Sequence, residues 1–229
     1  MTFLGFLAPA SASYNQISVV ELCFFNPYAD IRFTANRLPH WQQSGAVYFV
    51  TFRLADAVPH NLRTQWESER EEWLRVHPKP WSTEIECQYH ERFSDAIERW
   101  LDAGYGSCIL RQPNCADIVT QTLRYFDGQR LVMISSVVMP NHAHALFVQN
   151  AEWPLEKVLR SWKSFTSRKI NSLLHREGSL WQRDYFDRLV RDERHFANCV
   201  RYIRRNPAKA RLHDGEYSLY ETELARNIE

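Results

Sequence analysis

Hydrophobic and polar residues alternate with two different periods along this chain, and the two periods predict a mixed α+β fold. Short runs rich in β-branched and aromatic residues predict strands. Longer runs with apolar residues every three or four positions predict amphipathic helices. In chain order, the predicted elements are a strand over 46–54, helices over 61–76, 86–103 and 115–126, strands over 130–139 and 142–149, a helix over 154–174, a strand over 185–191 and a helix over 193–205.

Turn-forming and capping residues separate these elements. Pro140 and Asn141 leave only two residues between two predicted strands, which indicates antiparallel neighbours. Asp192 has the side chain of an N-cap residue for the last helix. Pro207 follows that helix closely, and because proline lacks a backbone N–H, we expect the helix to end before it.

The order of the elements predicts the fold. Without the helices in the region 62–106, the order is strand, helix, strand, strand, helix, strand, helix. This is the ferredoxin-like order with one extra C-terminal helix. We therefore expect an α+β protein with an antiparallel sheet, helices packed on it, and a helical insert over about 62–106. Residues 1–33 are a poorly specified lead-in, 34–212 form the domain, and 213–229 form a C-terminal tail.

Charge is distributed unevenly, although the formal net charge is only +1. Residues 151–211 contain 15 Lys and Arg against 7 Asp and Glu, whereas residues 62–102 contain 6 Lys and Arg against 10 Asp and Glu. A basic third beside an acidic insert favours a polyanionic partner. Solvated helix faces explain the same counts, so charge alone leaves both interpretations open.

The apolar segments and the cysteines argue against several classes of protein. No apolar run approaches the roughly 20 residues of a membrane span, so we expect no membrane partner. Residues 1–12 lack the basic segment of a signal peptide. The five cysteines form no C-x-x-C pair, which argues against a disulfide framework or a cysteine-based zinc site and is typical of the cytoplasm.

Two residue pairs carry candidate chemistry. His142 and His144 lie two apart on a predicted strand, so both imidazoles point to the same face, roughly 6–7 Å apart at the backbone. Tyr202 and Asn206 lie four apart on the last predicted helix, hence also on one face. Together they offer two nitrogen ligands, one oxygen ligand and a hydroxyl nucleophile. Core histidines, a core tyrosine and an asparagine that ends the helix explain each pair separately.

Three segments resemble a known family in combination. They are 138–144 (VMPNHAH), 179–188 (SLWQRDYFDR) and 202–210 (YIRRNPAKA), with further likeness at 37–41 and 162–166. These segments resemble REP-associated tyrosine transposases, which belong to the single-tyrosine HUH transposase superfamily. The likeness covers about residues 32–212. Many family members have a larger apolar residue at the position of Ala143.

The resemblance implies a ferredoxin-like fold, a Mg²⁺ or Mn²⁺ cofactor, and cleavage of single-stranded DNA near hairpins through a 5′-phosphotyrosine. By matching position, Tyr202 is the expected nucleophile, and His142, His144 and Asn206 are the expected metal ligands. A monomer is favoured over a homodimer. The expected nucleic-acid contacts are Trp41, Lys163, Arg183, Arg204 and Arg205, together with Trp181. For the tryptophans core packing is an equal alternative, and for the arginines a solvated face is one.

Three other functions use parts of the same pattern. A domesticated protein would bind DNA hairpins without cutting them. A rolling-circle initiator or relaxase shares the two-histidine motif, but those proteins usually have a third histidine ligand and a different context around the tyrosine. A zinc hydrolase would need a third nitrogen or sulfur ligand, and the nearby sequence offers none.

Overall fold

A five-stranded antiparallel sheet forms the centre of the molecule in the computed structural model, which describes residues 22–35, 39–78 and 81–229. The spatial order of the strands is β6-β3-β5-β4-β7. Their bounds are Val47–Arg53 for β3, Leu131–Val138 for β4, His142–Gln149 for β5, Phe186–Leu189 for β6 and Ser218–Glu221 for β7. In chain order, β3-α4-β4 and β5-α5-β6 are two interleaved strand–helix–strand units. The predicted ferredoxin-like α+β fold is therefore confirmed.

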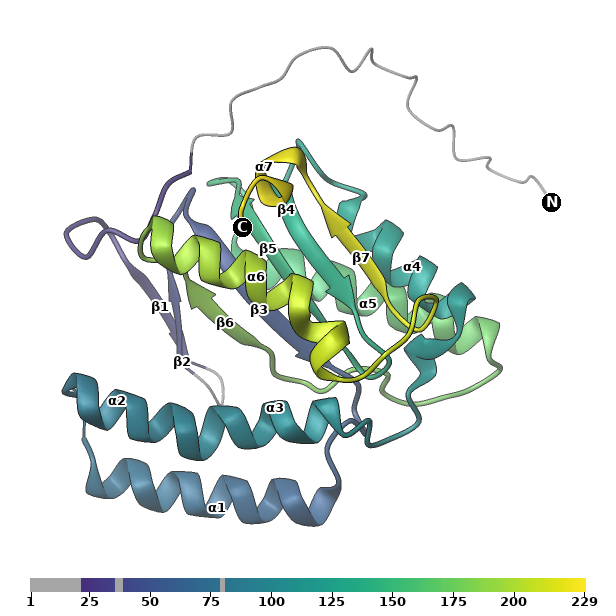
Figure 1. Ribbon diagram of the computed structural model, residues 1–229, viewed down its shortest axis with the longest axis horizontal. Helices are drawn as coiled ribbons and strands as arrows, with labels where there is room; N and C mark the ends of the chain where they lie inside the picture. Colours follow the sequence, from purple (N-terminus) through teal and green to yellow (C-terminus); the bar gives the residue numbers. More distant parts are fainter. Residues whose placement is uncertain (1–21, 36–38, 79–80) are drawn as a thin grey trace.

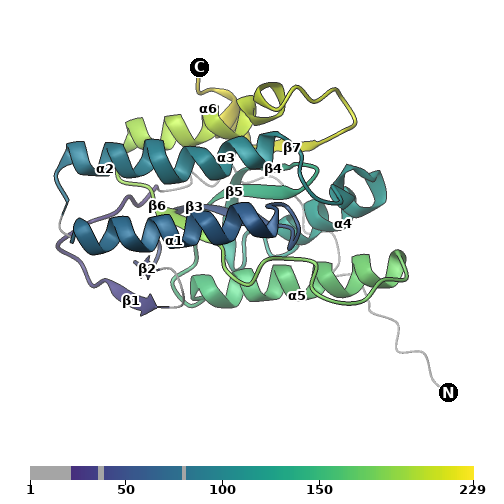
Figure 2. The same ribbon diagram turned by 90° about the horizontal axis from the view of Figure 1, so that it is seen from below.

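Helices cover both faces of the sheet. Helices α4 (Pro113–Arg124) and α5 (Leu155–Leu173) lie on one face, and α6 (Glu193–Lys209) crosses the other (Figures 1 and 2). Alternate residues of β3 divide between the two cores: Tyr48 and Val50 pack on the side of α4 and α5, while Val47 and Phe49 pack on the side of α6. This is the period-two alternation expected of a strand buried on both faces.

The insert forms a pair of antiparallel helices across one end of the sheet (Figure 1). Helix α1 (His60–Val76) is followed by α2 (Thr83–Tyr89), a π-helical segment η1 (His90–Ser94) and α3 (Asp95–Asp102). Trp73 is the centre of its own aromatic cluster, with ring centroids 5.2 Å from Trp81, 5.4 Å from Tyr89 and 5.8 Å from Phe93. A short 3₁₀ helix, η2 (Ile109–Arg111), then leads into α4.

Short elements at both ends extend the predicted domain. Strands β1 (Arg32–Ala35) and β2 (Pro39–Gln42) pair with each other, and β7 adds a fifth strand beside β4. Helix α7 (Glu223–Arg226) follows β7. Sequence analysis gives no strand or helix in 213–229, because a four-residue element is too short to show a period. The first 21 residues of the predicted lead-in lie outside the described residues.

The end of α6 corrects one expectation. The helix continues through Pro207 to Lys209, although the proline lacks the N–H that would bind the carbonyl four residues earlier. Only the last turn of the helix lacks this hydrogen bond. Beyond it, the Ala210 N–H donates to the Asn206 carbonyl at 3.0 Å, and the Leu212 N–H donates to the Pro207 carbonyl at 3.0 Å. The predicted N-cap is confirmed: the Asp192 carboxylate accepts from the His195 N–H at 2.7 Å.

None of the helices in the described part of the chain is long and apolar enough to cross a membrane. All five cysteines are free thiols.

Candidate metal and tyrosine site

The two histidines lie at the start of β5, on the face that α6 covers. His144 is opposite Thr51 of β3, and His142 is opposite Arg53. Both imidazoles are buried, with 1% and 0% of the residue exposed, and their ring centroids are 4.7 Å apart. The predicted juxtaposition on one face is therefore confirmed.

Each imidazole is held through its Nδ1 atom. The Thr51 hydroxyl lies 2.7 Å from Nδ1 of His144, and Oδ1 of Asn141 lies 2.7 Å from Nδ1 of His142. The Asn141 amide is fixed in turn, because its Nδ2 donates to the backbone carbonyls of Leu101 at 3.1 Å and Tyr105 at 3.2 Å. Its Oδ1 must therefore accept a hydrogen bond from the His142 Nδ1–H. This leaves the Nε2 lone pair of His142 free to bind a metal.

Helix α6 brings Tyr202 and Asn206 over the histidines. The Tyr202 ring meets His144 edge-on at a centroid distance of 5.2 Å and Phe49 at 5.6 Å. Asn206, one turn further, is 1% exposed. Two imidazole rings, a buried carboxamide and a phenol from elements some sixty residues apart thus meet at one place, as the two sequence pairs predict.

Four buried polar atoms at this place have no hydrogen-bond partner among the residues that the structure describes. They are Nε2 of His142, Nε2 of His144, and Oδ1 and Nδ2 of Asn206. Buried polar groups are normally paired, so a group of unpaired ones indicates an absent partner. Two imidazole nitrogens and an amide oxygen suit a divalent ion with positions left open for water or phosphate. The residues therefore fit the expected Mg²⁺ or Mn²⁺.

Burial keeps both imidazoles neutral. It lowers the pKa of His142 to about 3. The Asn206 side chain opposes this shift, and the positive charges of Arg53 and Lys209 add to it. Burial also holds the pKa of His144 well below the ordinary value, with the His142 charge as the next cause. The neutral imidazole is the form that binds a metal ion, so the site is preset for coordination.

The Tyr202 hydroxyl donates a hydrogen bond to the carboxylate of Glu98, on α3 of the insert. Burial raises the pKa of Tyr202 far above its usual range, and the negative charge of Glu98 raises it further. Burial also raises the pKa of Glu98, while the hydrogen bond from Tyr202 and the charge of Lys209 oppose that shift. The phenol is therefore protonated in the resting protein.

Sequence analysis missed four side chains of this site: Thr51, Arg53, Glu98 and Asn141. Thr51 and Arg53 alternate along β3, and a polar residue at every second position of an otherwise apolar strand was the available signal. Asn141 lies within the segment 138–144, but its local sequence does not indicate that it orients His142. Glu98 was hidden among the other acidic residues of the insert.

The predicted DNA contacts are scattered over the molecule. Arg183 and Arg205 are exposed. Trp41 lies in β2, paired with Phe33. Lys163 lies on α5, on the opposite face of the sheet from α6, and its Nζ donates to the Arg183 carbonyl at 2.7 Å; burial lowers its pKa to about 8.

Arg204 and Trp181 have structural roles instead. The Arg204 guanidinium donates to the Ala225 and Ile228 carbonyls at 2.7 and 2.6 Å and pairs with Glu221 at 3.0 Å. It thereby fastens the C-terminal segment to α6 and has few donors left for a phosphate. Trp181 is 3% exposed, and its ring packs against Phe52 at a centroid distance of 4.7 Å. Core packing therefore explains Trp181.

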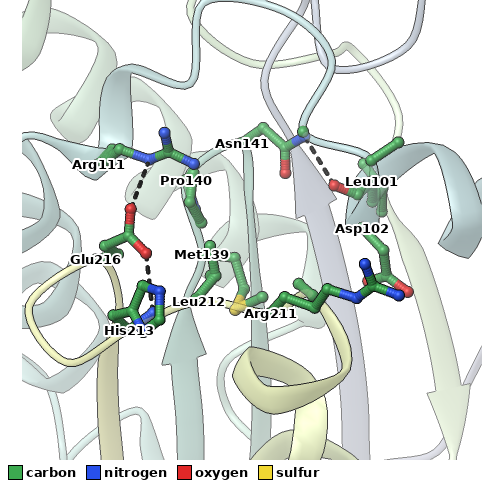
Figure 3. A pocket seen from close by; sticks show the side chains of 13 residues that line it. Leu101, Asp102, Arg111, Met139, Pro140, Asn141, Arg211, Leu212, His213 and Glu216 are labelled. Carbon is green, nitrogen blue, oxygen red and sulfur yellow. Dashed lines mark hydrogen bonds and ion pairs between the residues drawn. The ribbon is translucent and has the colours of Figure 1, made fainter.

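A cavity of about 330 Å³ adjoins the site beyond Asn141. It lies between the end of α3, the turn after β4 and the chain that leaves α6 (Figure 3). Its polar lining includes Asp102, Arg111, Arg211 and Glu216, of which Arg111 and Glu216 form an ion pair at 3.5 Å. His142, His144 and Tyr202 do not line it.

The part of the chain that carries this site is similar to known proteins. A search of curated proteins gave no match. Two solved structures are similar at 15% identity. One is a REP-associated tyrosine transposase bound to a REP hairpin, with 74% of this chain and 71% of that chain covered and a TM-score of 0.40. The other is a putative transposase from Deinococcus radiodurans, with 81% and 98% covered and a TM-score of 0.28.

A comparison with protein families matches the segment that contains the site. Residues 112–206 match the family described as "Transposase IS200 like". The matched segment contains both histidines of β5 as well as Tyr202 and Asn206, which are the residues that the geometry brings together. The segment 112–206 of this chain is therefore similar to the IS200-like transposase family.

Proposed function

We propose that this protein is a metal-dependent endonuclease and strand transferase that cuts single-stranded DNA next to hairpin-containing repeats. The observation that supports it best is the set of unpaired buried atoms on His142, His144 and Asn206. The two imidazole rings are 4.7 Å apart, and the His144 ring lies 5.2 Å from the Tyr202 ring. In a purely structural core, buried polar atoms are normally hydrogen-bonded, whereas a metal site next to a nucleophile needs unpaired ligand atoms.

A bound Mg²⁺ or Mn²⁺ supplies positive charge against the phosphate oxygens, where negative charge grows during cleavage. His142, His144 and Asn206 would hold that ion. Tyr202 attacks the phosphorus in line, which gives a 5′-phosphotyrosine and a free 3′-hydroxyl. Because the covalent intermediate preserves the energy of the broken bond, a second 3′-hydroxyl can displace the tyrosine and join strands. This is the reason for proposing transfer rather than hydrolysis.

The substrate proposal rests on charge and on the motifs. The basic stretch 151–211 contains two of the three segments that resemble REP-associated tyrosine transposases, 179–188 and 202–210, and Arg183 and Arg205 are exposed within it. Exposed guanidinium groups bind the phosphates of DNA regardless of the DNA sequence. A single chain contains all the site residues identified above, so we propose that the protein acts as a monomer.

The decisive experiment follows the covalent intermediate. Single-stranded hairpin DNA, labelled on the 3′ side of the cut, is incubated with the protein in Mn²⁺ or in EDTA and run on a denaturing gel. We expect a protein–DNA band in Mn²⁺ only, and none from Tyr202→Phe, which keeps the ring but lacks the hydroxyl.

Mass mapping of the adduct identifies the nucleophile. Tyr185 is the internal control, because it is 7% exposed and packs in the core on the side of α4 and α5. An adduct on Tyr185, or one that survives Tyr202→Phe, contradicts the assignment. Tight hairpin binding without any adduct would instead identify a non-cleaving hairpin-binding protein.

A further inference from the structure

The helical insert is attached directly to the candidate site. Asn141, which orients His142, donates to the carbonyls of Leu101 and Tyr105 at the end of α3. Lys209 at the end of α6 pairs with Asp102 of α3 at 2.9 Å. The third attachment is the hydrogen bond from Tyr202 to Glu98. Helix α3 therefore lies against both elements that supply the reacting groups.

The third attachment reaches the reacting atom itself. A phenol that attacks phosphorus must give up its proton, and a protonated Tyr202 is a poor nucleophile. Glu98 is the one carboxylate, among the side chains that the structure describes, that accepts a hydrogen bond from this hydroxyl. The Lys209 ammonium lies 6.0 Å from the centroid of the Tyr202 ring, and a cation cannot take a proton. The negative charge of Asp102 also raises the pKa of Tyr202, but this carboxylate pairs with Lys209 at 2.9 Å, and the hydroxyl donates to Glu98.

We propose that Glu98 is a catalytic residue, contributed by the insert, that accepts the Tyr202 proton during cleavage and returns it during joining. This inference rests on the proposed function. The proton passes from the Tyr202 oxygen to the Glu98 carboxylate as that oxygen bonds to phosphorus. The bond between phosphorus and the 3′ oxygen breaks, and the 3′ oxygen takes a proton from water. In joining, the incoming 3′-hydroxyl loses its proton to water, and protonated Glu98 returns its own to the departing Tyr202 oxygen.

The geometry explains why a base from the insert is needed. The half-buried Tyr202 ring packs edge-on against Phe49 and His144, which stack on each other, so side chains replace part of the water around it. Burial strengthens Glu98 as a proton acceptor, because it raises the pKa of this carboxylate. The insert thus supplies a proton acceptor at this position, where the described residues of the β-sheet domain place no carboxylate in hydrogen-bond contact with the hydroxyl.

The test compares Glu98→Gln with the unmodified chain in single-turnover cleavage of the hairpin substrate. Glutamine keeps the size and can still accept a hydrogen bond, but it takes no proton. We expect the rate constant to fall by about 10²–10⁴-fold, the usual effect of losing a general base, while the dissociation constant for the hairpin stays unchanged. Glu91→Gln is the matched control, because Glu91 is an exposed glutamate of the same insert, and it should cleave normally.

A second measurement detects the contact without any cleavage. The chain is labelled with ¹³C at the Cζ atom of tyrosine, and the Tyr202 signal is identified by its disappearance in Tyr202→Phe. Glu98→Gln should shift that signal, and Glu91→Gln should not. An unshifted signal, or Glu98→Gln cleaving as fast as the unmodified chain, overturns the role of Glu98. If the unmodified chain cuts no hairpin DNA, the proposed function itself is overturned. That result differs from a chain that cuts DNA equally well with and without Glu98.

Discussion

At the scale of single residues, two hydrogen bonds determine what the histidines can do. An imidazole has one nitrogen that carries a proton and one that is free, and the partner of Nδ1 decides which is which. Asn141 and Thr51 occupy Nδ1 of His142 and His144 respectively. Both Nε2 atoms have no hydrogen-bond partner among the described residues. If the site binds the proposed metal, its affinity should therefore depend on residues that do not touch the ion.

Thr51→Val tests this dependence. Valine matches the shape of threonine but leaves His144 Nδ1 without its partner, so the ring loses its fixed orientation. We expect Mn²⁺ affinity, measured by calorimetry, to fall by about 10–100-fold with little change in the thermal unfolding midpoint. Thr64→Val, on the exposed face of α1, is the control. Equal affinities for the two variants would show that Thr51 does not position the ligand.

His142→Ala and His144→Ala test the metal ligands themselves. We expect each to abolish Mn²⁺-dependent cleavage while leaving hairpin binding nearly intact, because phosphate contacts dominate affinity for DNA. Gel-shift titration and circular dichroism on the same samples separate the two effects. Joint loss of folding and binding would instead indicate that the histidines serve only the core.

The sequence predicts the two histidines, Tyr202 and Asn206, but not the side chains that bind them, for a physical reason. His142 and His144, like Tyr202 and Asn206, are close in the chain, so the strand and helix periods alone place each pair on one face. The hydrogen bond between Glu98 and Tyr202 spans 104 positions. No local period encodes such a contact, since it depends on how the insert docks.

At the scale of elements, the docking of the insert depends on a tight turn at Gly106. Its φ is +86°, and a Cβ there would overlap the backbone carbonyl of Asp56. The same turn is held by the Ser107 N–H, which donates to the Asp56 carboxylate at 2.8 Å. The helices themselves were predictable from the three- and four-residue spacing of their aromatic residues. Their position across the end of the sheet was not, because it is fixed by this close approach.

Gly106→Ala should therefore move α3 away from the site. Gly178→Ala is a well-matched control, because its φ of +89° carries the same backbone penalty while nothing lies within 4 Å of the added Cβ. We expect the control to lose about 1–2 kcal/mol of unfolding free energy from backbone strain alone, and Gly106→Ala to lose a further ~1–3 kcal/mol from overlap. Urea unfolding measures both, and the ¹³C signal of Tyr202 should shift only in Gly106→Ala. Equal losses in the two variants would argue against a rigid turn.

At the scale of the whole molecule, the charge distribution favours a DNA-binding surface. The structure separates basic residues that bind other parts of the protein from those that are exposed. Arg204 has its guanidinium committed to Ala225, Ile228 and Glu221, whereas its neighbour Arg205 is exposed on α6. Sequence alone could not separate these two adjacent arginines, because the distinction depends on a C-terminal segment whose own elements are too short to predict.

This division predicts opposite results for the two neighbours. DNA binding should weaken steeply with salt, since each phosphate contact releases counterions. Arg205→Ala should weaken binding and reduce the slope of log affinity against log salt by about 1, with an unchanged unfolding midpoint. Arg204→Ala should leave that slope unchanged but speed hydrogen exchange in β7 and α7, because those elements lose their attachment to α6.

Fluorescence anisotropy at a series of salt concentrations gives the slopes, and exchange mass spectrometry gives the protection. A slope that changes for Arg204→Ala and not for Arg205→Ala would place the DNA against the C-terminal segment, and binding that ignores salt altogether would remove the basic stretch from the interface.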